Sequence, residues 1–157
     1  YPLPRLLDIF IKVCDATSFA HSRNIIPRDL KPDNIQVSDY GEVLLCDWGL
    51  AKDINSPNQS SEEINFSETI EQQTITGTIK GTPGYMAPEQ VKNSFRDISV
   101  QTDIYALGCV LYTILTLKSP IECDDLDILI DKTVSGDISP PSKRVSDHIP
   151  KALEAVT

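Results

Sequence analysis

The sequence predicts a mainly α-helical domain with one short β-hairpin. Hydrophobic side chains recur every three to four residues over about 5–22, which is the spacing of an amphipathic helix. Two β-prone runs, 35–38 and 42–46, lie on either side of a loop that contains Gly41, a pattern typical of a hairpin. The chain has 157 residues, of which 40% are hydrophobic, so it is long enough to bury one core.

The segment from Asp53 to Ile79 is unlike the helical regions around it. It contains five acidic residues, no Lys or Arg, and many Ser, Thr, Asn and Gln side chains. This composition predicts a mobile surface loop. Order is expected to return at GTPGYMAPEQ, where two prolines and two glycines bend the backbone before a short helix near 89–92.

Three helices are predicted beyond this point. Ser99 or Thr102 is placed to cap a helix that runs through DIYALGCVLYTILTL. Because this helix is apolar on nearly every face, we expect it at the centre of the domain. A further helix over about 126–134 should end at Gly136, and a last helix should start near Pro150.

Charge, length and cysteine spacing disfavour several classes of function. The chain has 14 Lys and Arg against 23 Asp and Glu, a net charge of -9, which disfavours nucleic acid and anionic membrane as partners. The longest stretch without charge or proline, 104–117, has 14 residues, whereas a membrane-spanning helix needs about 18 or more. No signal-peptide pattern is visible, and the four cysteines form no CxxC pair. We expect a cytoplasmic protein with reduced core cysteines and no membrane contact within this chain, which leaves open an anchor elsewhere in a parent protein.

Four polar residues on the two sides of the hairpin favour a metal and phosphate site. Asp29, Lys31 and Asn34 precede the hairpin, and Asp47 follows it. Two oxygen ligands of the kind that magnesium prefers would thus lie beside a lysine and one further carboxylate, which can accept a hydroxyl proton. Taken alone, PRDLKPDN is better explained as an ordinary polar turn. DWG could likewise be a turn with a buried Trp48.

Four motifs in order along the chain resemble the eukaryotic-type (Hanks) Ser/Thr protein kinase family, specifically its C-terminal lobe. They are IIPRDLKPDN, DWGLAK, GTPGYMAPE and DIYALG, and DWGLAK looks most like bacterial members. The resemblance implies a kinase-like C-terminal lobe (α+β) with the N-terminal lobe absent. Residues 1–157 would then be a partial kinase domain, from the helix before the catalytic loop into a truncated late helix. A flexible activation-segment insert would occupy 53–80.

The same resemblance implies a catalytic role for each of the four polar residues. Asp29 would be the catalytic base, and Lys31 would neutralise charge on the γ-phosphate of ATP. Asn34 and Asp47 would hold two Mg²⁺ ions. A lysine at position 31, within LKP, is what members specific for Ser and Thr show. The implied activity is transfer of the ATP γ-phosphate to Ser or Thr hydroxyls of a protein substrate, with the N-terminal lobe of the parent chain as a partner and the isolated fragment inactive.

Five further residues receive structural or regulatory roles from the resemblance. Thr82 would hydrogen-bond near Asp29 and Lys31, Glu89 would anchor the substrate loop, and Asp103 would accept backbone N–H bonds from the catalytic loop. Arg28 would pair with a phosphate on Thr78 and so order the activation segment. The alternative for Thr78 is that it is one hydroxyl among many in a flexible loop.

Several departures from the family pattern bear on activity. Pro27 stands where the family has His, so it has no N–H for Asp103 and no imidazole to brace the backbone of Asp47. This favours, as an alternative function, a catalytically weakened pseudokinase-type binding or scaffold module. A small-molecule phosphotransferase is a third hypothesis, which GTPGYMAPE disfavours. The usual arginine partner of Glu89 is absent, Trp48 replaces Phe and should pack in the core, and His21 is expected to be a helix-end or packing residue.

Overall fold

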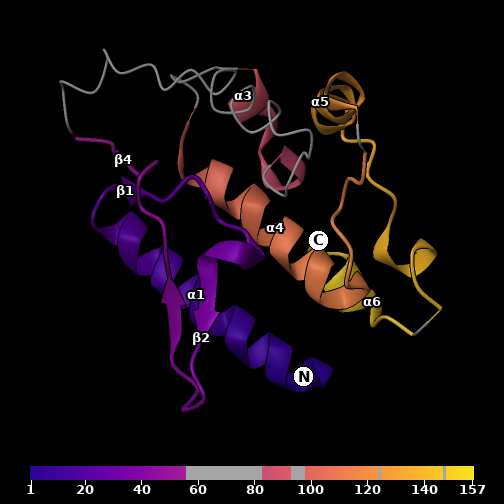
Figure 1. Cartoon of the computed structure of the whole chain (residues 1–157), viewed down its shortest axis with the longest axis horizontal. Coiled ribbons are helices and arrows are strands. Elements are labelled where there is room, and N and C mark those ends of the chain that lie inside the picture. The colour runs from indigo at the N-terminus through magenta and orange to yellow at the C-terminus, as the bar shows by residue number, and fades with distance from the viewer. Residues whose placement is uncertain (56–82, 93–97, 124, 147) are drawn as a thin grey trace.

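The computed structural model describes residues 1–55, 83–92, 98–123, 125–146 and 148–157. Thr78, Thr82 and most of the predicted insert at 53–80 lie outside the described residues. The described part is mainly helical, as the sequence predicted, and it contains two small two-stranded sheets (Figure 1) where the sequence predicted a single hairpin.

The first helix and the hairpin have almost the predicted bounds. Helix α1 spans Leu3–Ser22 and has a proline in its first turn. The N–H groups of the first turn have no partner within the helix, so the missing N–H of proline costs no helical hydrogen bond there. Strands β2 (Ile35–Val37) and β3 (Val43–Leu45) pair antiparallel. Gly41 in the connecting loop has a φ of 85°, which glycine adopts without steric strain. Local sequence patterns therefore account for both elements.

A second pair of strands, which the sequence did not predict, closes the segment that contains PRDLKPDN. Residues 27–34 of this segment are called the polar loop below. Strand β1 (Ile25–Ile26) pairs antiparallel with β4 (Lys52–Asp53). The Ile54 amide extends this ladder by donating to the Asn24 carbonyl at 2.9 Å. The chain thus leaves the end of α1, forms the polar loop and the hairpin, and returns to its starting point. This pairing fixes both ends of the segment that contains the candidate site.

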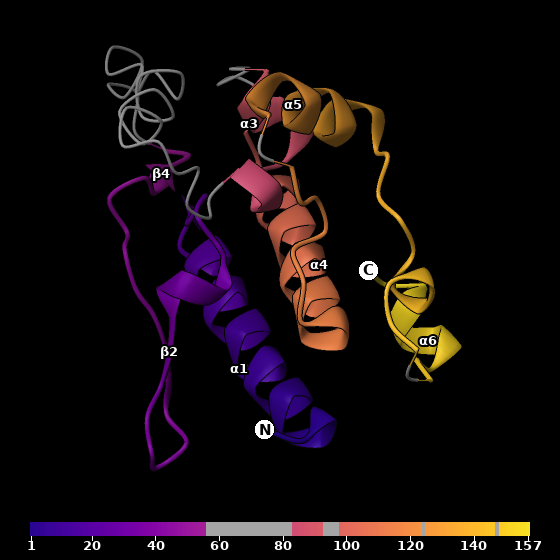
Figure 2. The same cartoon turned by 45° about the vertical axis from the view of Figure 1, so that its right-hand side comes forward.

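Helix α4 (Val100–Thr116) is the central helix of the fold. Ser99 is its N-cap residue, and the Ser99 amide donates to Thr102 Oγ1, so both predicted capping residues take part. Helices α1 and α4 lie side by side in two views (Figures 1 and 2). A shared core of Val13, Leu30, Ala106 and Leu107 joins them. Since Leu30 belongs to the polar loop, this core also anchors the candidate site.

The remaining elements flank α4. Helix α3 (Pro88–Val91) follows the 3₁₀ turn η2 (Pro83–Tyr85), and α5 (Leu126–Ser135) ends at Gly136, which has a φ of 69°. The turn η4 (Pro141–Lys143) and helix α6 (Lys151–Glu154) complete the chain. Among the helices that the structure describes, none combines the length and the apolar character needed to cross a membrane.

The four cysteines are free thiols, as predicted, but only Cys109 is fully buried, and Cys14 is partly buried against the core. Cys109 on α4 is buried, whereas Cys14, Cys46 and Cys123 are partly exposed. Burial raises the pKa of Cys109 to about 12. Its thiol is therefore neutral near pH 7 and unreactive as a nucleophile.

Candidate active site

The polar loop after β1 brings Asp29, Lys31 and Asn34 into direct contact. The 3₁₀ turn η1 (Pro32–Asn34) folds the chain back, so that Asn34 Nδ2 donates to both the carbonyl oxygen and Oδ2 of Asp29 at 2.8 Å. Lys31 Nζ forms an ion pair with the same Oδ2 at 2.9 Å, with side-chain exposures of 13% for Lys31 and 10% for Asp29. Both donors converge on Oδ2, and within the part of the chain that the structure describes no hydrogen bond to Oδ1 of Asp29 is found.

The hairpin returns Asp47 to the same region. The Cys46 amide donates to the Asn34 carbonyl at 2.8 Å, so Asp47 follows directly after a residue that is bonded to Asn34. Asp47 has a φ of 57° and an exposed side chain. Asn34 directs its amide nitrogen toward Asp29, and its amide oxygen takes no part in those bonds. One amide oxygen and one carboxylate therefore match the oxygen ligands that Mg²⁺ takes.

Trp48, next to Asp47, is not a core residue, and that prediction is wrong. Its side chain is 44% exposed, and its indole Nε1 donates to the Leu45 carbonyl at 2.9 Å. The positive φ of Asp47 turns the chain before Trp48, and the next residues form a turn closed by a hydrogen bond from the Ala51 amide to the Trp48 carbonyl. The indole is therefore held locally at the surface.

Asp103 links the polar loop to the two long helices. It is fully buried in the first turn of α4, and its Oδ1 accepts the Arg28 amide at 2.9 Å. Its Oδ2 accepts a hydrogen bond from Nε2 of His21, on the last turn of α1, at 2.7 Å. Burial raises the pKa of Asp103, and the hydrogen bonds from His21 and Arg28 oppose that shift. Although Pro27 has no N–H, Asp103 thus has partners on both oxygens.

Two cations lie beside this arrangement. Arg28 is buried, and burial lowers its pKa while the charge of Asp103 opposes the shift. Lys52 on β4 also has a lowered pKa, first through burial and then through the positive charge of Arg28. The β1–β4 pairing brings these two cations together. Such a pair favours an anion nearby.

The segment before α4 contacts the loop through two neighbouring side chains. Glu89, predicted to anchor the substrate loop, accepts a hydrogen bond from Thr102 Oγ1 at 2.6 Å. Gln90 is buried, and its Nε2 donates to the carbonyl of Arg28 at 2.8 Å. Thr82, which was predicted to lie near Asp29, falls outside the described residues.

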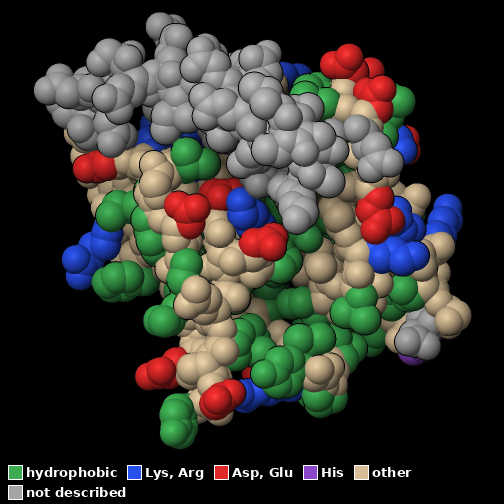
Figure 3. All heavy atoms as spheres, viewed as in Figure 1, with side chains coloured by type: hydrophobic (Ala, Val, Ile, Leu, Met, Phe, Trp, Pro, Cys, Tyr) green, Lys and Arg blue, Asp and Glu red, His purple; other side chains and the backbone are tan. Residues whose placement is uncertain are grey.

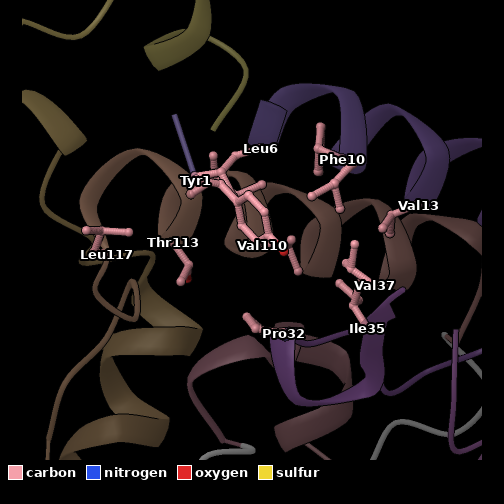
Figure 4. A pocket seen from close by; sticks show the side chains of 12 residues that line it. Tyr1, Leu6, Phe10, Val13, Pro32, Ile35, Val37, Val110, Thr113 and Leu117 are labelled. Atoms are coloured by element: carbon pink, nitrogen blue, oxygen red, sulfur yellow. The ribbon is translucent and has the colours of Figure 1, made fainter. Parts of the chain in front are cut away.

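The surface near the loop separates charged from apolar side chains. Figure 3 shows acidic and basic side chains close together near the middle of one face, with hydrophobic side chains gathered below them. An apolar pocket of about 260 Å³ lies between α1, α4 and β2 (Figure 4). Pro32 of the polar loop lines this pocket, together with Phe10, Val13 and Val110. The pocket suits an apolar group, whereas the charged side chains above it suit a phosphate group.

Sequence reasoning missed three residues of this site, namely His21, Lys52 and Gln90. No spacing pattern predicts the contacts of these residues, because their partners lie far away along the chain. The hydrogen bond between His21 and Asp103 spans 82 positions, and the one between Gln90 and Arg28 spans 62. A weak signal existed for His21 alone, since a histidine in the last turn of a helix is often placed to bind an anion.

Comparison with known proteins identifies the class to which this fold and loop belong. A family profile described as "Protein kinase domain" matches residues 4–153, nearly the whole chain. The chain therefore belongs to the protein kinase family, which confirms the resemblance carried by the four motifs.

The individual relatives are serine/threonine-protein kinases of bacteria. The chain is 45% identical over 125 residues to "Serine/threonine-protein kinase PknD" of Protochlamydia amoebophila, covering 78% of this chain and 12% of that protein. It is 44% identical over 117 residues to PknD of Chlamydia caviae, and 43% identical over 122 residues to PknD of Chlamydia muridarum. Each of these two matches covers 73% of this chain and 12% or 13% of the relative. The predicted similarity to bacterial members is confirmed.

Proposed function

We propose that the chain is the C-terminal-lobe part of a Ser/Thr protein kinase that transfers the γ-phosphate of ATP to Ser or Thr hydroxyls of a protein substrate. The observation that carries the proposal is the contact set around Asp29, whose Oδ2 is held by Lys31 and Asn34 while Oδ1 has no hydrogen bond from the described residues. The chain spans about an eighth of the length of the curated relatives. The lobe that covers the nucleotide, and the protein substrate, therefore belong to the proposal for the whole protein, as does a cytoplasmic location.

Asp29 would act as the base in this reaction. It would orient the attacking hydroxyl and accept its proton as the new O–P bond forms and the bond to the leaving ADP oxygen breaks. Lys31, held beside Asp29, would offset negative charge on the transferring phosphoryl group. Because Asn34 and Leu30 fix the loop on either side of Lys31, little reorganisation would be needed when substrate binds.

Asn34 and Asp47 would hold magnesium. The fit rests on their chemistry, since an amide oxygen and an exposed carboxylate are hard ligands, and the Cys46–Asn34 hydrogen bond brings them to the same region. Bound Mg²⁺ would neutralise phosphate charge. Within the described residues no group of three or more His, Cys, Asp or Glu side chains is placed to hold a metal. Phosphate and water would therefore have to complete the coordination shell.

A binding or scaffold module without catalysis is the second candidate, and one observation favours it. Pro27 is buried at the start of the loop, where the family has a histidine, and so brings neither a backbone N–H nor an imidazole. The bonds from His21 and Arg28 to Asp103 weigh against this alternative, because they hold the loop in spite of Pro27. The same assay distinguishes the two candidates.

The test is transfer of labelled phosphate from Mg-ATP to a generic basic protein by the full-length protein. We expect Asp29→Asn to lower kcat by roughly 10²- to 10⁴-fold, the usual contribution of a general base. Asp33→Asn is the matched control, because Asp33 is an exposed aspartate in the same loop. Transfer that is absent in the wild type, or that is unaffected by Asp29→Asn, would contradict the proposal and favour the scaffold.

A further inference from the structure

Gln90 is a buried amide that joins two parts of the molecule. Only 2% of the residue is exposed, and both ends of its side chain are hydrogen-bonded. Its Oε1 accepts the Ala87 amide at 3.0 Å, within the segment that leads into α3. Its Nε2 donates to the carbonyl of Arg28 at 2.8 Å, directly before Asp29. The amide thus connects the segment 87–90 to the loop that carries the proposed base.

The backbone of Arg28 needs such a contact. It has a φ of 72°, in the left-handed region that non-glycine residues seldom adopt. Such a conformation persists only where the surrounding structure holds it. Here Asp103 of α4 accepts the Arg28 N–H, and Gln90 of α3 donates to the Arg28 carbonyl. Side chains from two separate helices therefore hold both polar groups of one strained residue.

The Arg28 carbonyl belongs to the peptide group that joins Arg28 to Asp29. Its orientation therefore sets the direction in which the Asp29 backbone leaves Arg28, and with it the position of the carboxylate. Lys31 and Asn34, which contact that carboxylate, both follow Asp29 in the chain. The Gln90 side chain instead donates a hydrogen bond to the carbonyl oxygen of the Arg28–Asp29 peptide group, which precedes the Asp29 side chain.

We propose that Gln90 is a positioning residue that couples the substrate-facing segment 87–90 to the orientation of Asp29. The inference rests on the proposed function, because Asp29 is the base only in that reaction. Without the Gln90 donor, the buried Arg28 carbonyl would lack its hydrogen bond and the Arg28–Asp29 peptide group would reorient. Since the hydrogen bonds of the Gln90 side chain go to Ala87 and Arg28 and not to Asn34 or Asp47, nucleotide affinity should not change.

The experiment compares two variants with one control in the full-length protein. Gln90→Met keeps the side-chain length but removes both polar ends. Gln101→Met makes the same change at an exposed position on α4. We expect Gln90→Met to lower kcat for a protein substrate by roughly ten- to hundredfold, as for a misplaced catalytic group, with the KM for ATP unchanged. A kcat within twofold of the wild type, or a matching rise in the KM for ATP, would overturn the inference.

Gln90→Glu supplies a readout that a purely structural role would not give. A protonated glutamic acid can donate to the Arg28 carbonyl, whereas its carboxylate can only repel it. The ratio of variant to wild-type kcat should therefore fall as pH rises through the ionisation of Glu. A ratio independent of pH would count against the inference, even if Gln90→Met fails to fold.

An activity-free measurement separates this inference from the proposed function. The Asp29 amide belongs to the peptide group in question, so its NMR chemical shift should move in Gln90→Glu and not in Gln101→Met. If the wild type transfers no phosphate, the proposed function fails, yet a shifted Asp29 amide would still support the coupling. An unmoved Asp29 amide would overturn the coupling itself.

Discussion

Replacing His21 by alanine should destabilise the protein through Asp103. The carboxylate of Asp103 is fully buried, and the substitution removes the 2.7 Å hydrogen bond to its Oδ2, leaving the Arg28 amide on Oδ1. A hydrogen bond to a charged group contributes about 1.5–3 kcal/mol. The His21 side chain is 16% exposed, so solvent screening weakens this figure little. The free energy of unfolding should therefore fall by about 1.5–3 kcal/mol.

Urea denaturation of the purified protein is the assay, with two further variants. His21→Phe keeps a ring of similar size but no donor, so it separates the lost hydrogen bond from lost packing and should be destabilised nearly as much. His148→Ala removes the exposed histidine near the C-terminus and should change stability by less than about 0.5 kcal/mol. If His21→Phe and His21→Ala both unfold like His148→Ala, the hydrogen bond does not stabilise Asp103 and the reasoning is refuted.

Two predictions concern pH and regulation. Burial raises the pKa of Asp103 above its ordinary value of 3.8, so the folded state binds this proton more tightly than the unfolded chain does. The contribution of Asp103 to stability is therefore greatest below pH 3.8 and declines as pH rises through the higher folded pKa. The side chain of Asp103→Asn does not titrate, so this variant should gain stability relative to the wild type as pH rises from 4 to 7. If the urea midpoints of the variant and the wild type differ by the same amount at every pH, the prediction is wrong. For regulation, we expect mass spectrometry to find phosphate on Thr78 of the active full-length protein, where a charge of about -1.5 to -2 would pair with Arg28. Thr78→Ala and Arg28→Met should each lower activity without adding to one another, and an unmodified Thr78 in fully active protein, or additive losses, would reject the pairing.

Local patterns in the sequence were enough to predict most of the secondary structure. The three-to-four-residue period of 5–22, the loop at Gly41 and the apolar run of α4 each depend on side chains close together in the chain. The structure confirms the helix α1, the hairpin and the central helix near those bounds. The polar residues Asp29, Lys31 and Asn34 could also be identified, because one tight turn brings them together.

The tertiary structure alone decided how that loop is held. Strands β1 and β4 have two residues each, too few to show a period, and they form because the ends of the loop meet beside α1. His21 reaches Asp103, and Gln90 reaches Arg28, because α1, α3 and α4 pack around one core. Trp48 is exposed because the turn after Asp47 directs it outward, despite its apolar ring. The sequence by itself predicted the residues of the candidate site, whereas their support comes from hydrogen bonds between distant residues, which local spacing cannot encode.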